Sequence, residues 1–155
     1  MIGVICHHSE IPAMQRSAAL TPLSREHHTA LSLAQQARKV ADDAAPAVVQ
    51  AMAERVRARF ECDLQPHFDE EERWLLPALQ RVGQQELVTR TLSEHRQLQQ
   101  LAERLSQPEV TLLHDFAERL IAHVRFEERE LFPCAERYPE ILAAAPQPPA
   151  AEDAD

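Results

Sequence analysis

Apolar residues recur every three or four positions in four long segments of the chain, the spacing that places them on one face of an α-helix. A proline at the first helical position and a glycine past the last one indicate helix boundaries, as Pro46 and Gly83 do for the second segment. The expected helices cover residues 22–42, Pro46 to Gly83, 85–106 and 109–137. Helices of this length with short connections predict an all-α, up-down-up-down four-helix bundle.

The composition agrees with one helical domain. A chain of 155 residues suits a single core, and only two glycines interrupt a sequence rich in good helix formers. We expect the bundle to span residues 21–138. An N-terminal extension, residues 1–20, precedes it, and a flexible tail rich in proline, alanine and acidic residues, residues 139–155, follows it.

Charge and hydropathy narrow the function classes. The formal net charge is -9, and no basic cluster is visible, so we expect no nucleic-acid partner. No apolar run is long enough to span a bilayer, and the first residues do not resemble a secretory signal, so we expect a cytoplasmic protein with no membrane contact. Widely spaced Cys6, Cys62 and Cys134 are expected to be reduced thiols.

Each apolar stripe carries a histidine where a leucine would be expected, and two stripes carry a glutamate one turn after the histidine. These residues are His27, His67, Glu71, His95, His123 and Glu127. An unpaired buried imidazole or carboxylate costs several kcal/mol, whereas a whole domain is stable by only about 5–15 kcal/mol. Six such groups in one core must therefore be compensated.

Two arrangements could compensate them. One is a buried hydrogen-bond network in a metal-free structural bundle, with the glutamates paired to protonated imidazoles. The other is a dinuclear metal site, which one imidazole from every helix and carboxylates from two helices favour. Nitrogen and oxygen ligands without thiolate suit iron or manganese, with zinc as an alternative. Open coordination positions would admit dioxygen, peroxide or nitric oxide.

Other catalytic patterns are missing from the sequence. The Glu-x-x-His pairs of ferritin-like di-iron bundles do not occur, and neither does the HExxH motif of zinc proteases. No glycine-rich elbow presents a serine or cysteine nucleophile.

One motif occurs twice: residues 67–77 read HFDEEERWLLP, and residues 123–133 read HVRFEERELFP. With REHHTAL around His27 and SEHRQL around His95, these motifs resemble the hemerythrin-like family, the HHE cation-binding domains, over about residues 20–138. The resemblance implies a four-helix bundle around a centre of two non-haem iron ions. Two carboxylates and an oxo or hydroxo group would bridge these ions.

The chain departs from oxygen-carrying hemerythrins at two positions. Those proteins have a second histidine one turn after the ligand of the third helix, where this chain has Gln99, and an aspartate where it has Glu128. The set of four histidines and two glutamates is more similar to that of iron-sulfur-cluster repair proteins and hemerythrin-like sensors. The resemblance therefore implies a small-ligand di-iron protein for sensing, detoxification or iron homeostasis, or alternatively an iron-donating module without turnover.

Some neighbouring residues allow more than one interpretation. His28 follows His27, but the stripe register favours His27 as the ligand and leaves His28 at the surface or behind the ligands. Among the acidic residues beside the ligands, Glu70 is the expected supporting carboxylate. Three prolines, at positions 66, 77 and 133, fall inside helical patterns and should bend their helices or leave upstream carbonyls open.

Overall fold

The computed structural model describes residues 16–147, and within them it is helical without any strand. The α-helices are α1 (Thr21–Arg38), α2 (Pro46–Arg59), α3 (Gln65–Glu70), α4 (Leu76–Arg81), α5 (Gln85–Arg104), α6 (Val110–Phe126), α7 (Phe132–Glu136) and α8 (Pro139–Ala143). Three π-helical segments connect some of them: η1 (Phe60–Leu64), η2 (Glu71–Leu75) and η3 (Glu127–Leu131). The all-α prediction is confirmed.

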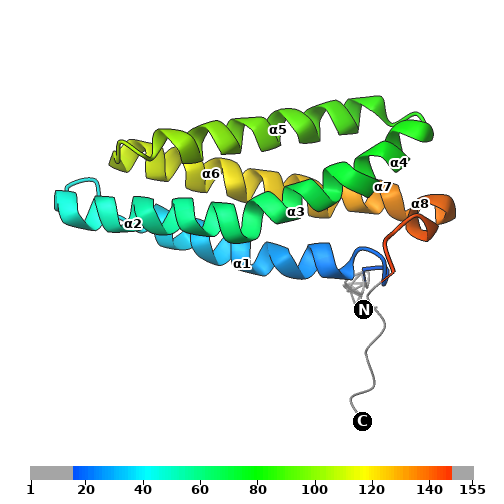
Figure 1. Cartoon of the computed structure of the whole chain (residues 1–155), viewed down its shortest axis with the longest axis horizontal. Coiled ribbons are helices and arrows are strands. Elements are labelled where there is room, and N and C mark those ends of the chain that lie inside the picture. The colour runs from blue at the N-terminus through cyan, green and yellow to red at the C-terminus, as the bar shows by residue number, and fades with distance from the viewer. Residues whose placement is uncertain (1–15, 148–155) are drawn as a thin grey trace, which may run out of the picture.

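The π segments make several of these helices continuous. The run from α2 through η1, α3 and η2 to α4 has no break, and neither does the run from α6 through η3 to α7. Figure 1 shows these two rods extending alongside α1 and α5. Helix α1 packs against α6 and α2, and α5 packs against α6. Counting α1 and α5 as rods too, residues from all four rods meet in one interior.

Two apolar clusters fill that interior. One lies around the buried Phe116 and contains residues of α1, α2, α5 and α6. The other lies around the buried Phe132 and contains residues of α1, α4, α5 and α7. Burying a large apolar side chain contributes about 1.5–3 kcal/mol, so these clusters supply most of the driving force for folding. Along α1 and α5 the histidine of the predicted site falls between the two clusters, and along the other two rods the site residues lie where one cluster ends and the other begins.

The prolines inside the rods explain the π segments. A proline has no backbone N–H, so it cannot close the α-helical ladder. Before each of the three prolines, the preceding residue donates its N–H to the carbonyl five residues back: Gln65 to Phe60, Leu76 to Glu71, and Phe132 to Glu127. Each π turn contains one extra residue and turns the side chains around it, as π bulges at functional sites often do. Segments η2 and η3 begin at the two predicted carboxylate ligands.

The structure differs from the expected boundaries at both ends of the bundle. The sequence places Leu20 in the extension, but this residue is fully buried, and Arg16 bonds to the side chain of Glu128. The sequence places residues 139–143 in the flexible tail, but they form α8, which begins at Pro139 and buries Ile141. A single helical turn is too short for its periodicity to stand out in an Ala- and Pro-rich stretch. Residues 1–15, which include Cys6, and residues 148–155 lie outside the described residues.

Candidate metal centre

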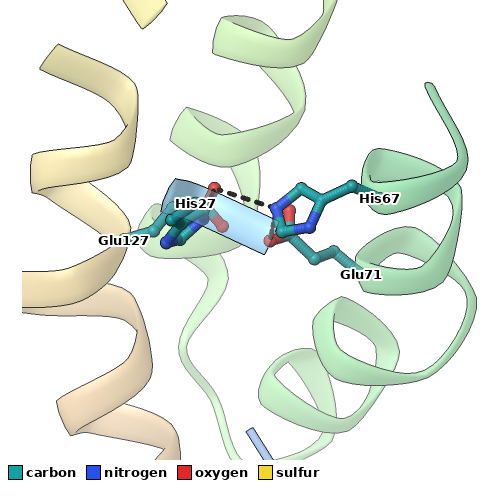
Figure 2. Close-up of side chains that lie close together, drawn as sticks. All are labelled: His27, His67, Glu71 and Glu127. Atoms are coloured by element: carbon teal, nitrogen blue, oxygen red, sulfur yellow. Dashed lines mark ion pairs between the residues drawn. The ribbon is translucent and has the colours of Figure 1, made fainter. Parts of the chain in front are cut away.

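The six residues singled out in the sequence converge in the middle of the bundle. The four histidines are 1–4% exposed, and the two glutamates are fully buried. His27 comes from α1, His67 from α3, His95 from α5 and His123 from α6, while the glutamates begin η2 and η3. Figure 2 shows the side chains of His27, His67, Glu71 and Glu127 close together, with His67 and Glu71 projecting from the same continuous rod. His28 is exposed.

The six side chains form two groups of four that share both glutamates. His27 and His67 belong to one group, and His95 and His123 belong to the other; Glu71 and Glu127 belong to both. Within each group, one nitrogen or oxygen atom per residue lies within 4.8 Å of the others. This spacing is suited to a cation coordinated by all four atoms.

The carboxylate of Glu71 spans the two groups. Its Oε1 lies 2.8 Å from Nε2 of His67, and its Oε2 lies 3.0 Å from Nε2 of His95. Each oxygen therefore faces a histidine of a different group, which is the geometry of a carboxylate that bridges two cations. Glu127 faces both groups through one oxygen atom: its Oε1 lies 2.6 Å from Nε2 of His123 and 3.5 Å from Nε2 of His27.

The atoms that face the centre have no hydrogen-bond partners among the described residues. This holds for Nε2 of all four histidines and for both oxygens of both glutamates. Several approach one another within 2.6–3.0 Å, but these contacts are not hydrogen bonds. A buried polar atom without a partner is costly, and a bound cation would remove that cost for all eight atoms. The residues present therefore fit a pair of metal ions.

Each histidine presents its other nitrogen, Nδ1, to a second carboxylate. Nδ1 lies 2.7 Å from Glu128 for His27 and 2.5 Å from Glu26 for His67. Nδ1 of His123 lies 2.9 Å from Glu94, whereas Nδ1 of His95 lies 3.6 Å from Glu72, which is an ion-pair distance too long for a hydrogen bond. A carboxylate at Nδ1 fixes the ring orientation and directs the Nε2 lone pair to the metal, as in carboxylate–histidine–metal triads.

The expectation that Glu70 would be the supporting carboxylate is wrong. Glu70 pairs with Arg73 on the outer side of the rod. The four carboxylates that do support the imidazoles each lie next to a predicted ligand in the sequence: Glu26 before His27, Glu94 before His95, Glu72 after Glu71, and Glu128 after Glu127. A neighbouring residue points about 100° away around the helix, so it reaches the imidazole of an adjacent helix. The acidic residues next to the predicted ligands are therefore the feature of the sequence from which these supporting carboxylates could have been predicted.

The profile of the hemerythrin HHE cation binding domain matches residues 18–135, a span that contains all six converging residues. The chain belongs to this family. No curated protein and no solved structure matches the chain. The hemerythrin match agrees with cation binding by the His and Glu groups described above.

The electrostatics of the hemerythrin centre depend on the two buried glutamates. Burial lowers the pKa of His67, but the charge of Glu71 and the contacts with Glu127 and Glu26 together outweigh burial and raise the pKa to about 12. Burial likewise opposes the charge of Glu127 at His123, whose pKa is raised to about 10. Burial raises the pKa of Glu127, yet His123 holds it well below its ordinary value. In the metal-free domain, protons on the imidazoles therefore occupy the place of the cations.

Aromatic rings stack on two of the converging histidines of the hemerythrin domain. Phe68 stacks on His95 with ring centroids 3.9 Å apart, and Phe132 stacks on His27 with centroids 5.3 Å apart and an interplanar angle of 6°. Both phenylalanines are buried. They limit the rotation of the imidazoles and keep water away from the ligand atoms, which strengthens the electrostatic interactions inside.

A cavity lies beside one of the converging histidines, on one side of the hemerythrin domain. Its volume is about 490 Å³, and α1 and the rod from α2 to α4 contribute its walls. The lining is mainly apolar, with Leu23, Leu33 and Trp74 among its residues, and it includes His67 and its partner Glu26. The cavity is large enough for a small molecule next to one of the converging histidines.

Two further observations concern features outside the centre. Cys62 is exposed and Cys134 is buried, and both are free thiols. Within residues 16–147, none of the helices has the length and hydropathy needed to cross a membrane.

Proposed function

We propose that this hemerythrin domain binds two non-haem iron ions through His27, His67, Glu71, His95, His123 and Glu127. It then binds or reacts with a small ligand, dioxygen, peroxide or nitric oxide, in sensing, detoxification or iron homeostasis. The observation that carries the proposal is the pair of four-residue groups that share Glu71 and Glu127. Two cations in these groups would each have two nitrogen and two oxygen ligands.

The donor atoms are compatible with iron, although they do not select it over manganese. Imidazole and carboxylate ligands without thiolate are typical of iron and manganese sites, and zinc is the remaining alternative. When bound, a pair of iron ions supplies redox and Lewis-acid chemistry toward a small ligand. Gln99, one turn after His95, donates a hydrogen bond to Gln65 at 2.6 Å, which keeps it out of the ligand set. Coordination positions therefore stay open.

The surroundings of the centre support small and uncharged ligands. The cavity beside His67 has an apolar lining, which favours entry of neutral diatomic molecules or peroxide over larger polar substrates. The phenylalanines that stack on His27 and His95 restrict the space on the other sides. The residues of the cavity would bind and orient the small molecule, and the phenylalanines would exclude bulk water from the metal-binding atoms.

The test is to load the protein with Fe²⁺ without oxygen and then add nitric oxide, peroxide or dioxygen in separate experiments. We expect a spectral change that saturates with at least one of the three, and none with a Glu71→Ala variant. If the iron-loaded protein gives no spectral change and consumes none of the three, a small-ligand function is excluded.

An iron-donating or scavenging module without turnover is the second candidate. It is favoured by Glu26, which holds His67 and whose side chain is 52% exposed, because a ligand with a solvent-accessible support releases its metal more easily. This function predicts that a chelator removes the iron rapidly from the wild-type protein. Catalytic loss of peroxide or nitric oxide would contradict it.

Three further expectations stand with this proposal. They are the up-down-up-down order of the bundle, a cytoplasmic location, and the absence of a nucleic-acid partner. Each remains a prediction from the sequence.

A further inference from the structure

Arg16 holds one of the supporting carboxylates. Its Nη2 donates to Oε2 of Glu128 at 2.8 Å and to the Glu128 carbonyl oxygen at 2.9 Å. Oε1 of the same carboxylate lies 2.7 Å from Nδ1 of His27 and accepts a hydrogen bond from Ser24 at 2.6 Å. The guanidinium is therefore linked to His27 through a single carboxylate whose two oxygens are both engaged.

The same arginine also contacts the ring that packs on His27. Its guanidinium carbon lies 5.6 Å from the centroid of Phe132, which stacks on the imidazole. The other side of the guanidinium pairs with Glu136, whose second oxygen accepts the backbone N–H of Ser17. Arg16 is thus fixed by α7, and it fixes both the carboxylate and the aromatic neighbour of His27.

Arg90 repeats this arrangement in the other metal group. Its Nε donates to Oε2 of Glu94 at 2.8 Å, and Oε1 of Glu94 lies 2.9 Å from Nδ1 of His123. The guanidinium carbon lies 3.8 Å from the centroid of Phe126, a ring that neighbours His123 with centroids 6.5 Å apart. Its Nη1 reaches Glu130 at 3.2 Å. The same four groups, an arginine, a carboxylate, an imidazole and a phenylalanine ring, therefore occur together at both His27 and His123.

The two remaining histidines have no such support. Glu26, the partner of His67, and Glu72, the partner of His95, form no ion pair with an arginine within the part of the chain that the structure describes. Their side chains are 52% and 37% exposed. Each metal group therefore contains one histidine held through an arginine and one held by an exposed carboxylate alone.

We propose that Arg16 and Arg90 are positioning residues, each of which fixes one histidine in one of the two metal groups and so slows loss of that metal. The inference rests on the proposed metal binding. It predicts that His67 and His95, whose supporting carboxylates have no arginine partner, would leave a bound metal first during metal release. His27 and His123, which are anchored through the arginines, would leave it last.

The physical reason is the geometry of the guanidinium. Its donors point in fixed directions in one plane, so each arginine ties the supporting carboxylate to a second glutamate, Glu128 to Glu136 and Glu94 to Glu130, more rigidly than a single ammonium group would. A fixed carboxylate fixes the imidazole, and loss of a group that orients a ligand weakens metal binding by about 10–100-fold. An arginine acts one step further out, so we expect the lower end of that range. The effect should be larger for Arg16, whose side chain is 18% exposed, than for Arg90, at 50%.

The experiment measures iron release from the full chain. The wild type and the variants Arg16→Met, Arg90→Met and Arg55→Met are loaded with Fe²⁺ without oxygen, their iron is counted, and its transfer to ferrozine is followed over time. Methionine keeps an apolar stem over the phenylalanine ring but removes the charge. Arg55 is the matched control, because it is an exposed arginine that donates to Gln36 and contacts no metal-group histidine or supporting carboxylate.

We expect Arg16→Met to accelerate one of two release phases roughly tenfold, and Arg90→Met to accelerate the other by a smaller factor, with Arg55→Met like the wild type. A purely structural role would instead accelerate both phases together and lower the melting temperature of the metal-free protein. Arg16→Lys, which keeps a positive charge without the planar fork, should release iron at an intermediate rate, and it serves as the test if Arg16→Met does not fold.

Two negative results are distinguishable. If the wild type retains two irons and the Arg16 and Arg90 variants release them like Arg55→Met, the positioning role is overturned and the metal site stands. If the wild type itself retains no stoichiometric iron, the proposed function fails and the positioning role fails with it.

Discussion

Replacing Glu127 with glutamine tests how strongly one buried carboxylate holds the centre together. Glu127 is fully buried, and its Oε1 lies 2.6 Å from Nε2 of His123 and 3.5 Å from Nε2 of His27. Glutamine has the same shape but no charge, and its amide nitrogen donates where the carboxylate accepts. The variant therefore removes the counter-charge of the imidazoles with little change in packing.

The expected magnitude follows from the burial of this pair. In the metal-free protein, removal of one partner from a buried ion pair costs about 3–5 kcal/mol, because the other charge is left uncompensated. A domain of this size loses roughly 2–4 °C in melting temperature for each kcal/mol. We therefore expect metal-free Glu127→Gln to melt about 6–20 °C below the metal-free wild type.

The assay is thermal unfolding, followed by circular dichroism, after removal of metal with a chelator. Glu118→Gln is the control, since it removes the same charge from an exposed position of the same helix. The reasoning is refuted if the two variants melt within about 2 °C of each other, less than the loss of one kcal/mol would produce. Such a result would mean that the glutamate is not paired with the imidazoles in solution.

Three other predictions concern pH, backbone register and the core. Because the folded-state pKa values of His67 and His123 are raised to about 12 and about 10, the metal-free fold binds more protons than the unfolded chain above pH about 6.5. The contribution of these two histidines to the free energy of unfolding should be fully present below pH about 6.5. It should be lost as the pH rises toward 10, and urea titrations at several pH values would measure this loss. Pro77→Ala restores a backbone N–H and permits an α-helical register in place of η2, so iron content should fall with little change in melting temperature; unchanged iron content would contradict a role for the π turn. Phe116→Ala should lower stability by about 3–5 kcal/mol in denaturant titrations through a cavity in the apolar cluster, while the iron count stays that of the wild type.

The converging residues could be predicted because helical periodicity determines which side chains share a face. His67 and Glu71 lie on one stripe of the second helix, and His123 and Glu127 lie on one stripe of the fourth, so any packing that buries the stripes brings them together. The sequence also indicated that three prolines would disturb the rods. It did not indicate that the disturbance would be a π turn, because the hydrogen-bond register depends on how neighbouring helices hold the backbone.

The supporting residues were harder to predict because they act between helices. Glu26 precedes His27 in the sequence but supports His67 on another rod, and that pairing depends on the distance and rotation between the two. Arg16 lies in a stretch without periodicity, so nothing in the sequence connected it with Glu128, 112 positions later. Short-range patterns place side chains on faces, whereas contacts between faces depend on the packing.

The most direct test of the central claim is the iron content of the purified protein, measured by elemental analysis in the wild type and in His67→Ala and Glu71→Ala. His67 belongs to one group of ligands and Glu71 to both. The shared-glutamate arrangement predicts about two irons per wild-type chain, about one in His67→Ala, and close to none in Glu71→Ala. No stoichiometric metal in wild-type protein made with ample iron and without oxygen would contradict it, and so would equal iron in all three proteins.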